Sequence, residues 1–259
     1  MQMTQALDDL LCRRYPALYA DRHADMQSTA MCWGFEAGDG WFGIIDALSE
    51  VLTSQASAAG LLCPAAQQVK QKFGSLRFRV TVPAPGRQAI ALAEEMSRRV
   101  CEVSGRPGRL RLYGCRRMAT LAPGLEPGDA PGSDQATAAA TEADPLTGGM
   151  DVPPLAFTLD DMAQWRADVL TGPVEVPAGW RDLADAVLHV VQRERVQFGP
   201  VSIQHIWRDG TGMRLDWDEG GPSLEGLPTM AAALSKRLDL LSGTMDAGAV
   251  MAMPTALKI

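Results

Sequence analysis

The chain has 259 residues, of which 46% are hydrophobic, and its 24 Lys and Arg stand against 31 Asp and Glu, for a net charge of −7. This content can bury one large core or two ordinary ones. The chain lacks both an apolar run of the roughly 20 residues that span a bilayer and an N-terminal basic segment followed by a hydrophobic stretch, so we expect a cytoplasmic protein with no membrane partner.

The sequence pattern of the first half predicts two helices, a β-hairpin and a third helix. A leading helix includes Leu7-Asp8-Asp9-Leu10, and Gly40-Trp41 opens a second helix with apolar residues at helical spacing. Leu76-Arg77-Phe78-Arg79-Val80 alternates as a strand does. The apolar stripe Ile90, Ala93, Met96, Val100 and Val103 predicts a closing helix with Gly105 as its C-cap.

Residues 122–154 are rich in Pro, Gly, Ala, Thr and acidic side chains and contain almost no bulky hydrophobic residue. Such a segment buries too little surface to offset its chain entropy, which predicts a flexible linker. The linker divides the chain into a module at 1–121 and a module at 155–259.

The pattern of the first module recurs in the second. Gly179-Trp180 opens a helix, Met213-Arg214-Leu215-Asp216-Trp217 alternates as a strand, and Leu234-Ser235-Lys236-Arg237-Leu238 matches Met96-Ser97-Arg98-Arg99-Val100, at offsets of 139, 137 and 138 residues. Leu159-Asp160-Asp161-Met162 repeats the leading helix weakly. The sequence therefore predicts an α+β fold built as a tandem duplication of a helix-helix-β-hairpin-helix module.

Three motifs carry a resemblance to a known family. Gly38-Asp39-Gly40-Trp41-Phe42, the segment from Lys70 to Phe78 and Cys101-Glu102-Val103-Ser104-Gly105 resemble an uncharacterised bacterial and prophage family with GDGWF, KxKFGxLRF and zinc-ribbon-like CxxCG motifs. The resemblance covers most of residues 31–123 and implies an architecture more than an activity.

The zinc-binding element that the resemblance implies is degenerate here. Cys101 holds the first ligand position, but Ser104, Thr120 and Pro123 stand where the other ligands would fall. Structural zinc needs four Cys or His ligands, and Cys115 adds one sulfur at best, so we expect neither metal nor another cofactor. The five cysteines are scattered and odd in number, which favours reduced thiols.

No catalytic constellation is recognisable in the sequence. His23, His189 and His205 lie in different segments, and there is no nucleophile elbow, P-loop, HExxH or dinucleotide-binding fingerprint. We therefore expect a protein that is not an enzyme.

Charge is distributed unevenly between the halves. Up to Leu125 there are 15 basic and 11 acidic residues, and beyond it 9 basic and 20 acidic, so the first part carries +4 and the second −11. The first part contains a basic cluster suited to phosphates or to an acidic protein, with seven Arg in twenty residues and two more on the strand. Its members are Arg77, Arg79, Arg98, Arg99, Arg106, Arg109, Arg111, Arg116 and Arg117.

The acidic half favours a different partner. Its carboxylates gather around the predicted hairpin together with two tryptophans that could anchor an interface. We expect a noncatalytic protein-interaction protein, such as an immunity-type inhibitor of a basic bacterial toxin or a phage accessory factor. The alternative is a nucleic-acid-binding regulator that uses the basic cluster. The candidate partner-binding residues are Trp207, Asp209, Asp216, Trp217, Asp218 and Glu219.

Overall fold

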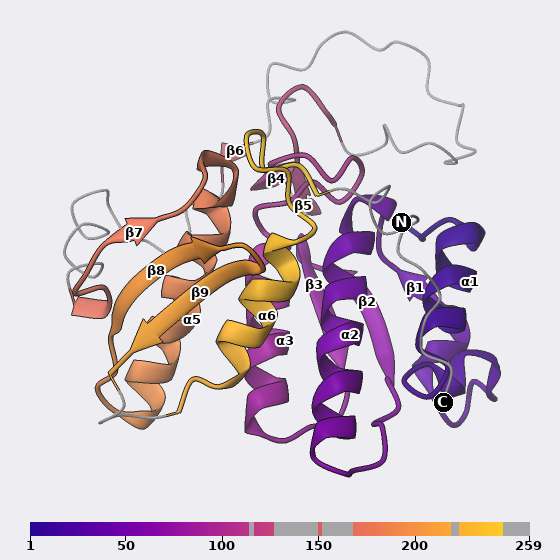
Figure 1. The fold of residues 1–259 in the computed structure, drawn as a ribbon. Coiled ribbons are helices and arrows are strands. Elements are labelled where there is room, and N and C mark those ends of the chain that lie inside the picture. The colour runs from indigo at the N-terminus through magenta and orange to yellow at the C-terminus, as the bar shows by residue number, and fades with distance from the viewer. Residues whose placement is uncertain (114–116, 127–149, 152–167, 219–222, 246–259) are drawn as a thin grey trace, which may run out of the picture.

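The computed structural model describes residues 1–113, 117–126, 150–151, 168–218 and 223–245. Three small three-stranded sheets surround a group of packed helices, so the α+β class predicted from the sequence is confirmed. One sheet lies at each side of the helices and the third lies above them in the view of Figure 1.

The first unit begins with a helix and ends with a hairpin followed by a helix. Strand β1 pairs in parallel with β2, and β2 pairs antiparallel with β3 through the two-residue turn Phe73-Gly74. The elements are α1 (Gln5–Arg14), η1 (Ala20–His23), η2 (Ala30–Trp33), β1 (Phe35–Glu36), η3 (Asp39–Trp41), α2 (Phe42–Ala58), β2 (Gln68–Lys72), β3 (Ser75–Arg79) and α3 (Ala84–Met96).

The second unit has the same order of elements from its first strand onward. Strand β7 pairs in parallel with β8, and β8 pairs antiparallel with β9. The predicted leading helix at 159–162 lies outside the described residues. The elements are β7 (Val174–Glu175), η4 (Ala178–Trp180), α5 (Arg181–Phe198), β8 (Ile203–Asp209), β9 (Gly212–Trp217) and α6 (Gly226–Ser235).

One serine in each unit ties the hairpin to the closing helix in the same way. The hydroxyl of Ser97 accepts the Leu76 N–H at 2.8 Å, and the hydroxyl of Ser235 accepts the Met213 N–H at 2.9 Å. Each hydroxyl also donates to a carbonyl three residues earlier in its helix. The serines therefore satisfy backbone donors at the start of the second strand that would otherwise be buried without a partner.

The third sheet follows the first unit. It consists of β4 (Arg109–Tyr113), β5 (Arg117–Leu121) and β6 (Met150–Asp151), in the order β5-β4-β6. Strand β6 belongs to the segment 122–154 that composition predicts to be a linker, and Ala122 at its start is buried. Residues 127–149 and 152–154 of that segment lie outside the described residues.

The predicted end of the third helix was wrong. Helix α3 ends at Met96, nine residues before Gly105. Val100 instead forms a β-bridge with Pro107, and the Gly105 N–H donates to the carbonyl of Cys101 in a separate turn. Apolar spacing continued past the helix because Val100 faces the same core from an extended segment.

Helices α2, α3, α5 and α6 pack together at the centre and join the two units through one core. Helix α3 contacts α6, while α2 contacts α6 and α5 contacts α3. The side-chain amide of Gln88 on α3 completes this junction, since it accepts the Gly226 N–H at 3.0 Å and donates to the carbonyl of Ser223 at 2.7 Å.

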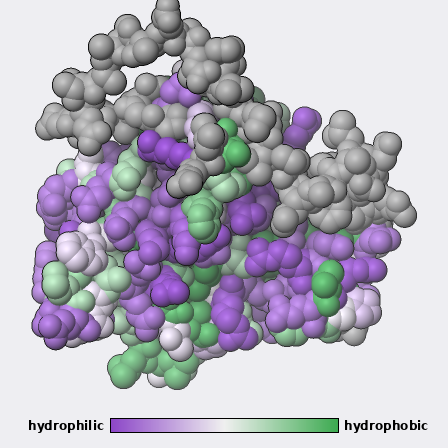
Figure 2. Space-filling model, turned by 180° about the vertical axis from the view of Figure 1, so that it is seen from behind, coloured by the Kyte–Doolittle hydropathy of each residue, from purple (hydrophilic) through white to green (hydrophobic). Residues whose placement is uncertain are grey.

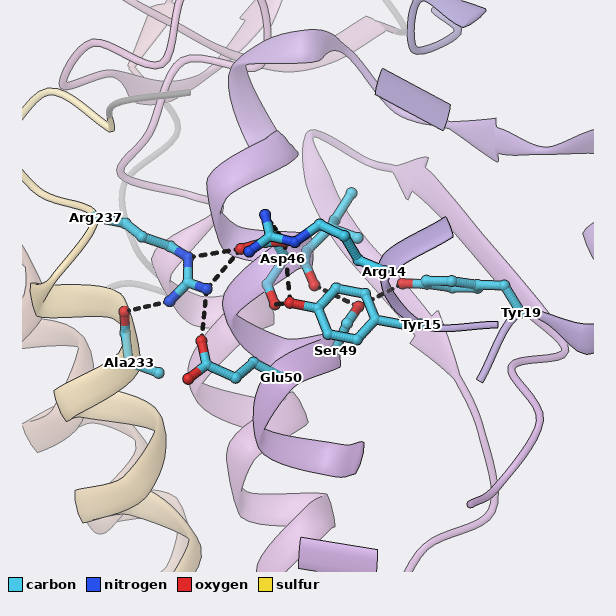
Figure 3. A network of polar contacts seen from close by, with 9 residues as sticks. Arg14, Tyr15, Tyr19, Asp46, Ser49, Glu50, Ala233 and Arg237 are labelled. Carbon is cyan, nitrogen blue, oxygen red and sulfur yellow. Dashed lines mark hydrogen bonds and ion pairs between the residues drawn. The ribbon is translucent and has the colours of Figure 1, made fainter. Parts of the chain in front are cut away.

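A buried ionic network also crosses the junction (Figure 3). Asp46 on α2 accepts hydrogen bonds from the guanidinium of Arg237, which follows α6, and from the hydroxyl of Tyr15. Arg237 also bonds Glu50, and Arg14 pairs with Asp46 at 2.8 Å. Burial, followed by the charge of Asp46, raises the pKa of Tyr15, so its hydroxyl stays a donor.

We expect a chain cut at one site in 127–149 to remain a single particle, because both products contribute to the same core. An engineered protease site there tests this: the two fragments should co-elute in size-exclusion chromatography and separate only in denaturant. Separate elution under native conditions would show that the units are independent domains.

The described surface is mostly hydrophilic when seen from behind, with hydrophobic residues gathered toward its lower end (Figure 2). Within the described ranges, no helix is long and apolar enough to cross a membrane.

Candidate functional site

The outer face of the sheet β7-β8-β9 carries two of the six predicted partner-binding residues, Trp207 and Asp216. In the hairpin register, Trp207 is opposite Arg214 and His205 is opposite Asp216, whereas Ile206 and Leu215 pair on the buried face. Directly paired residues share a face, so the first four side chains point away from the core. Glu175 on β7 pairs with Trp207 and extends this outer face.

The two tryptophans of the hairpin differ in their surroundings. The ring of Trp207 stacks on that of His205, with centroids 4.7 Å apart and planes inclined by 26°. His205 also lies 3.2 Å from a carboxylate oxygen of Glu175. Trp217 packs against the hydrophobic core instead. Of the two predicted anchors, Trp207 is therefore the one on the outer face.

Asp209 has a structural role in the hairpin turn. Its carboxylate accepts the N–H groups of Thr211 and Gly212 and pairs with Arg214. Hydrogen bonds from Thr211, then from Arg214, hold the pKa of Asp209 well below its usual range. This carboxylate closes the turn and is already bound to a guanidinium.

Two of the remaining acids are described and one is not. Asp216 and Asp218 are exposed, and the backbone N–H of Asp218 donates to the carbonyl of Ser202. Glu219 lies outside the described residues. The structure thus brings Asp216 together with Trp207, His205 and Glu175 on one face.

Much of the basic cluster is paired within the chain. Arg77 meets Glu94 at 3.4 Å, Arg99 meets Glu95 at 2.6 Å and Arg109 meets Asp182 at 3.1 Å. Arg98 also approaches Glu95, at 3.6 Å. These acids come from α3 and α5, so the local excess of positive charge seen in the sequence is reduced in space.

Other members of the cluster lie elsewhere. Arg106 and Arg117 are exposed, Arg111 is partly buried on β4, and Arg116 lies outside the described residues. Arg79 lines a shallow cavity of about 330 Å³ beside Arg87. The structure therefore does not gather all nine Arg on one surface.

The residues around Cys101 form an apolar cluster. Cys101 is buried with Tyr113, Ala119 and Leu121. Thr120, at one of the positions where the family resemblance would place a zinc ligand, donates its hydroxyl to the carbonyl of Gly74 at 2.7 Å. In the part of the chain that the structure describes, no three His, Cys, Asp or Glu lie close enough to hold a metal ion. The expectation of a metal-free protein stays a prediction.

The described thiols are unpaired, namely those of Cys12, Cys32, Cys63 and Cys101. Cys115 lies outside the described residues. Cys12 is in contact with Asp8, and burial is the largest cause that raises its pKa, to about 12. This thiol therefore stays protonated and is a poor nucleophile.

A second cavity, of about 230 Å³, lies where the tip of the first hairpin meets β5, and sequence reasoning missed it. Glu102 on its wall is only 2% exposed, and its Oε2 has no hydrogen-bond partner among the described residues. Burial raises the pKa of Glu102 to about 7, against the opposing effects of the Met1 ammonium and of Arg117. The cavity is lined by Met1, Gln71, Phe73, Glu102, Arg117 and Met118.

The sequence contained one signal for this cavity. Phe73 precedes Gly74 in a two-residue turn, where Asn or Asp is the usual choice. Its φ is +53° and its side chain is 63% exposed, so a bulky residue holds a strained conformation without being buried. The burial of Glu102 depends on β5 and on residues near the N-terminus, and no local pattern indicates it.

Comparison of the chain with protein-family models, with curated proteins and with solved structures finds no match. The resemblance to the bacterial and prophage family stays a prediction.

Proposed function

We propose that this chain is a noncatalytic protein-interaction protein that binds a basic partner through the outer face of the sheet β7-β8-β9. The observation that carries the proposal is the stacked pair Trp207 and His205, which lies outside the core between the exposed carboxylates of Glu175 and Asp216. A partly exposed aromatic pair surrounded by charged groups is typical of an interface anchor with a polar rim.

The charge of this half supports a basic partner. The residues after Leu125 carry −11, which would attract a cationic protein and speed its association. An immunity-type inhibitor of a nucleic-acid-degrading toxin must bind a cationic protein quickly, and so must a phage accessory factor that blocks a basic host protein. The unpaired thiols fit action in a reducing compartment such as the cytoplasm.

We also propose that the two units arose by tandem duplication of one module. Equivalent hydrogen bonds support this proposal. The Gly40 N–H donates to the carbonyl of Glu102, and the Gly179 N–H donates to that of Leu240, each at 3.0 Å. The serine contacts to the two hairpins repeat in the same manner. The duplicated copy would then have kept the fold while its hairpin changed from Arg79 to Asp216 at the matching strand position.

Charge reversal on the outer face tests the function. A tagged chain recovers the partner from a bacterial host, and association rates are then measured with the purified partner. The double variant Glu175→Lys and Asp216→Lys should associate at least about tenfold more slowly at low salt, and the difference should shrink at high salt. The control Asp9→Lys and Asp25→Lys makes the same charge change in the first unit and should leave the rate nearly unchanged.

Equal rates for the wild type and the outer-face variant would contradict the proposal. The alternative, a nucleic-acid-binding regulator, is favoured by Arg79 and Arg87, which flank one cavity. If that alternative holds, Arg79→Glu and Arg87→Glu should abolish salt-dependent binding of DNA or RNA, and the outer-face variant should not.

A further inference from the structure

Phe73 in the second cavity is not explained by the needs of the fold. Both residues of the first hairpin turn have positive φ, 53° at Phe73 and 72° at Gly74. The second hairpin closes differently, since the carboxylate of Asp209 caps a turn that contains Gly210. A phenylalanine in the left-handed region costs free energy, and one that is 63% exposed regains little of it by burial.

The carboxyl group of Glu102 is likewise not required by the fold. Its carbonyl accepts the Gly40 N–H, and Leu240 makes the same contact to Gly179 in the second unit with an apolar side chain. The backbone role therefore needs no carboxyl group. A buried carboxyl oxygen with no hydrogen-bond partner among the described residues is destabilising, so its presence beside a cavity points to a role in binding a ligand.

The cavity wall includes Glu102 and Arg117, which have opposite charges, together with apolar side chains, and the Met1 ammonium also acts on Glu102. Arg117 is exposed and its charge acts on Glu102, while Phe73 and Met118 supply the apolar surface. A ligand of one charge sign would satisfy one of these groups and repel the other. The volume of about 230 Å³ equals about eight water molecules at roughly 30 Å³ each, which suits a molecule no larger than a single amino acid.

We infer that this cavity binds a small zwitterion, a free α-amino acid with an apolar side chain. Glu102 on the cavity wall provides the negative charge for the ligand ammonium, and the guanidinium of Arg117 pairs with the ligand carboxylate. Phe73 and Met118 cover the side chain. The site is separate from the outer face of β7-β8-β9, so it does not depend on the proposed protein partner.

Binding should depend on pH in a defined direction. The pKa of Glu102 is raised to about 7, so below that pH a proton competes with the ammonium for the carboxylate. The other charged groups that act on this carboxyl are the Met1 ammonium and Arg117. Affinity should therefore fall by up to about tenfold per pH unit from pH 6.5 to pH 5.

Calorimetric titration of the full chain at pH 8 tests the inference with defined probes. L-phenylalanine and L-leucine represent the zwitterion. Phenethylamine lacks the carboxylate, and 3-phenylpropanoate lacks the ammonium. One of the two amino acids should bind, and both truncated compounds should bind at least about tenfold more weakly than L-phenylalanine or not at all.

Variants separate ligand binding from folding. Glu102→Gln should weaken amino-acid binding at least about tenfold and remove its pH dependence, while the urea midpoint at pH 8 rises because an unpaired buried charge is lost. Phe73→Asn should weaken binding without lowering the urea midpoint, because Asn tolerates the left-handed conformation. The control Asp9→Asn removes an exposed carboxylate elsewhere and should change neither quantity.

Three results would overturn the inference. The first is no binding of either amino acid at about 10 mM, a concentration at which even a weakly bound ligand of this size should be detected. The second is equal binding of phenethylamine, which would show that the carboxylate is not recognised. The third is unchanged affinity in folded Glu102→Gln.

Discussion

Replacement of Asp46 by asparagine is expected to lower the free energy of unfolding by about 3–5 kcal/mol, the range typical when one partner of a buried ion pair is removed. Asp46 is fully buried and Arg237 is 4% exposed. Within the described part of the chain, the substitution leaves the Arg237 guanidinium in the core with only Glu50 as a charged partner. Because Asp46 belongs to the first unit and Arg237 to the second, the loss weakens the junction between them.

Urea unfolding followed by tryptophan fluorescence measures this loss. Glu50→Gln is the matched control, since Glu50 contacts the same guanidinium but its side chain is 44% exposed. Solvent screens that pair, so the control should lose at most about 1 kcal/mol. A loss below about 1 kcal/mol for Asp46→Asn would show that the network adds nothing to the junction.

Alanine at Gly40 or at Gly179 is expected to destabilise the chain by about 3 kcal/mol at either position, the upper part of the usual range for overpacking. A Cβ at Gly40 would lie 2.2 Å from the carbonyl oxygen of Cys101, and one at Gly179 would lie 2.2 Å from that of Asp239. Both obstacles are backbone atoms, which cannot move aside as a flexible side chain could. The glycine N–H bonds to Glu102 and Leu240 would break as the loops separate.

Gly210→Ala provides the control for these two variants. Its Cβ would meet nothing within 4 Å, so the change in unfolding free energy should stay within about 0.5 kcal/mol. Urea unfolding of the three variants measures the differences. If Gly179→Ala left the free energy of unfolding unchanged while Gly40→Ala lowered it strongly, the two glycines would not have equivalent roles.

Sequence reasoning succeeded where the signal was local. Apolar residues at helical spacing after Trp41 and Trp180 predicted helices α2 and α5, and strand alternation predicted β3 and β9. It failed at the end of α3, where apolar spacing continued through Val100 although the chain had become extended. The spacing of apolar residues indicates which side chains face a core. A helix and an extended segment can both place such side chains against the core, so the spacing alone does not show where the helix ends.

The candidate sites depended on contacts between distant residues. Seven Arg in twenty residues looked like an open cationic surface, but Glu95 and Asp182 pair with three of these side chains in space. Asp209 looked like part of an acidic surface and instead closes a turn. Charge counted along a chain omits the partners that folding brings beside it.

By itself, the sequence determined the α+β class, helices α2 and α5 and strands β3 and β9, because helix and strand periodicity and turn residues act over a few positions. Only the tertiary structure decided that the two units share one core, that Asp46 pairs with Arg237 191 residues away, and that Glu102 lies buried on a cavity wall. These features depend on desolvation and on charge pairing across long sequence separations, which no local pattern encodes.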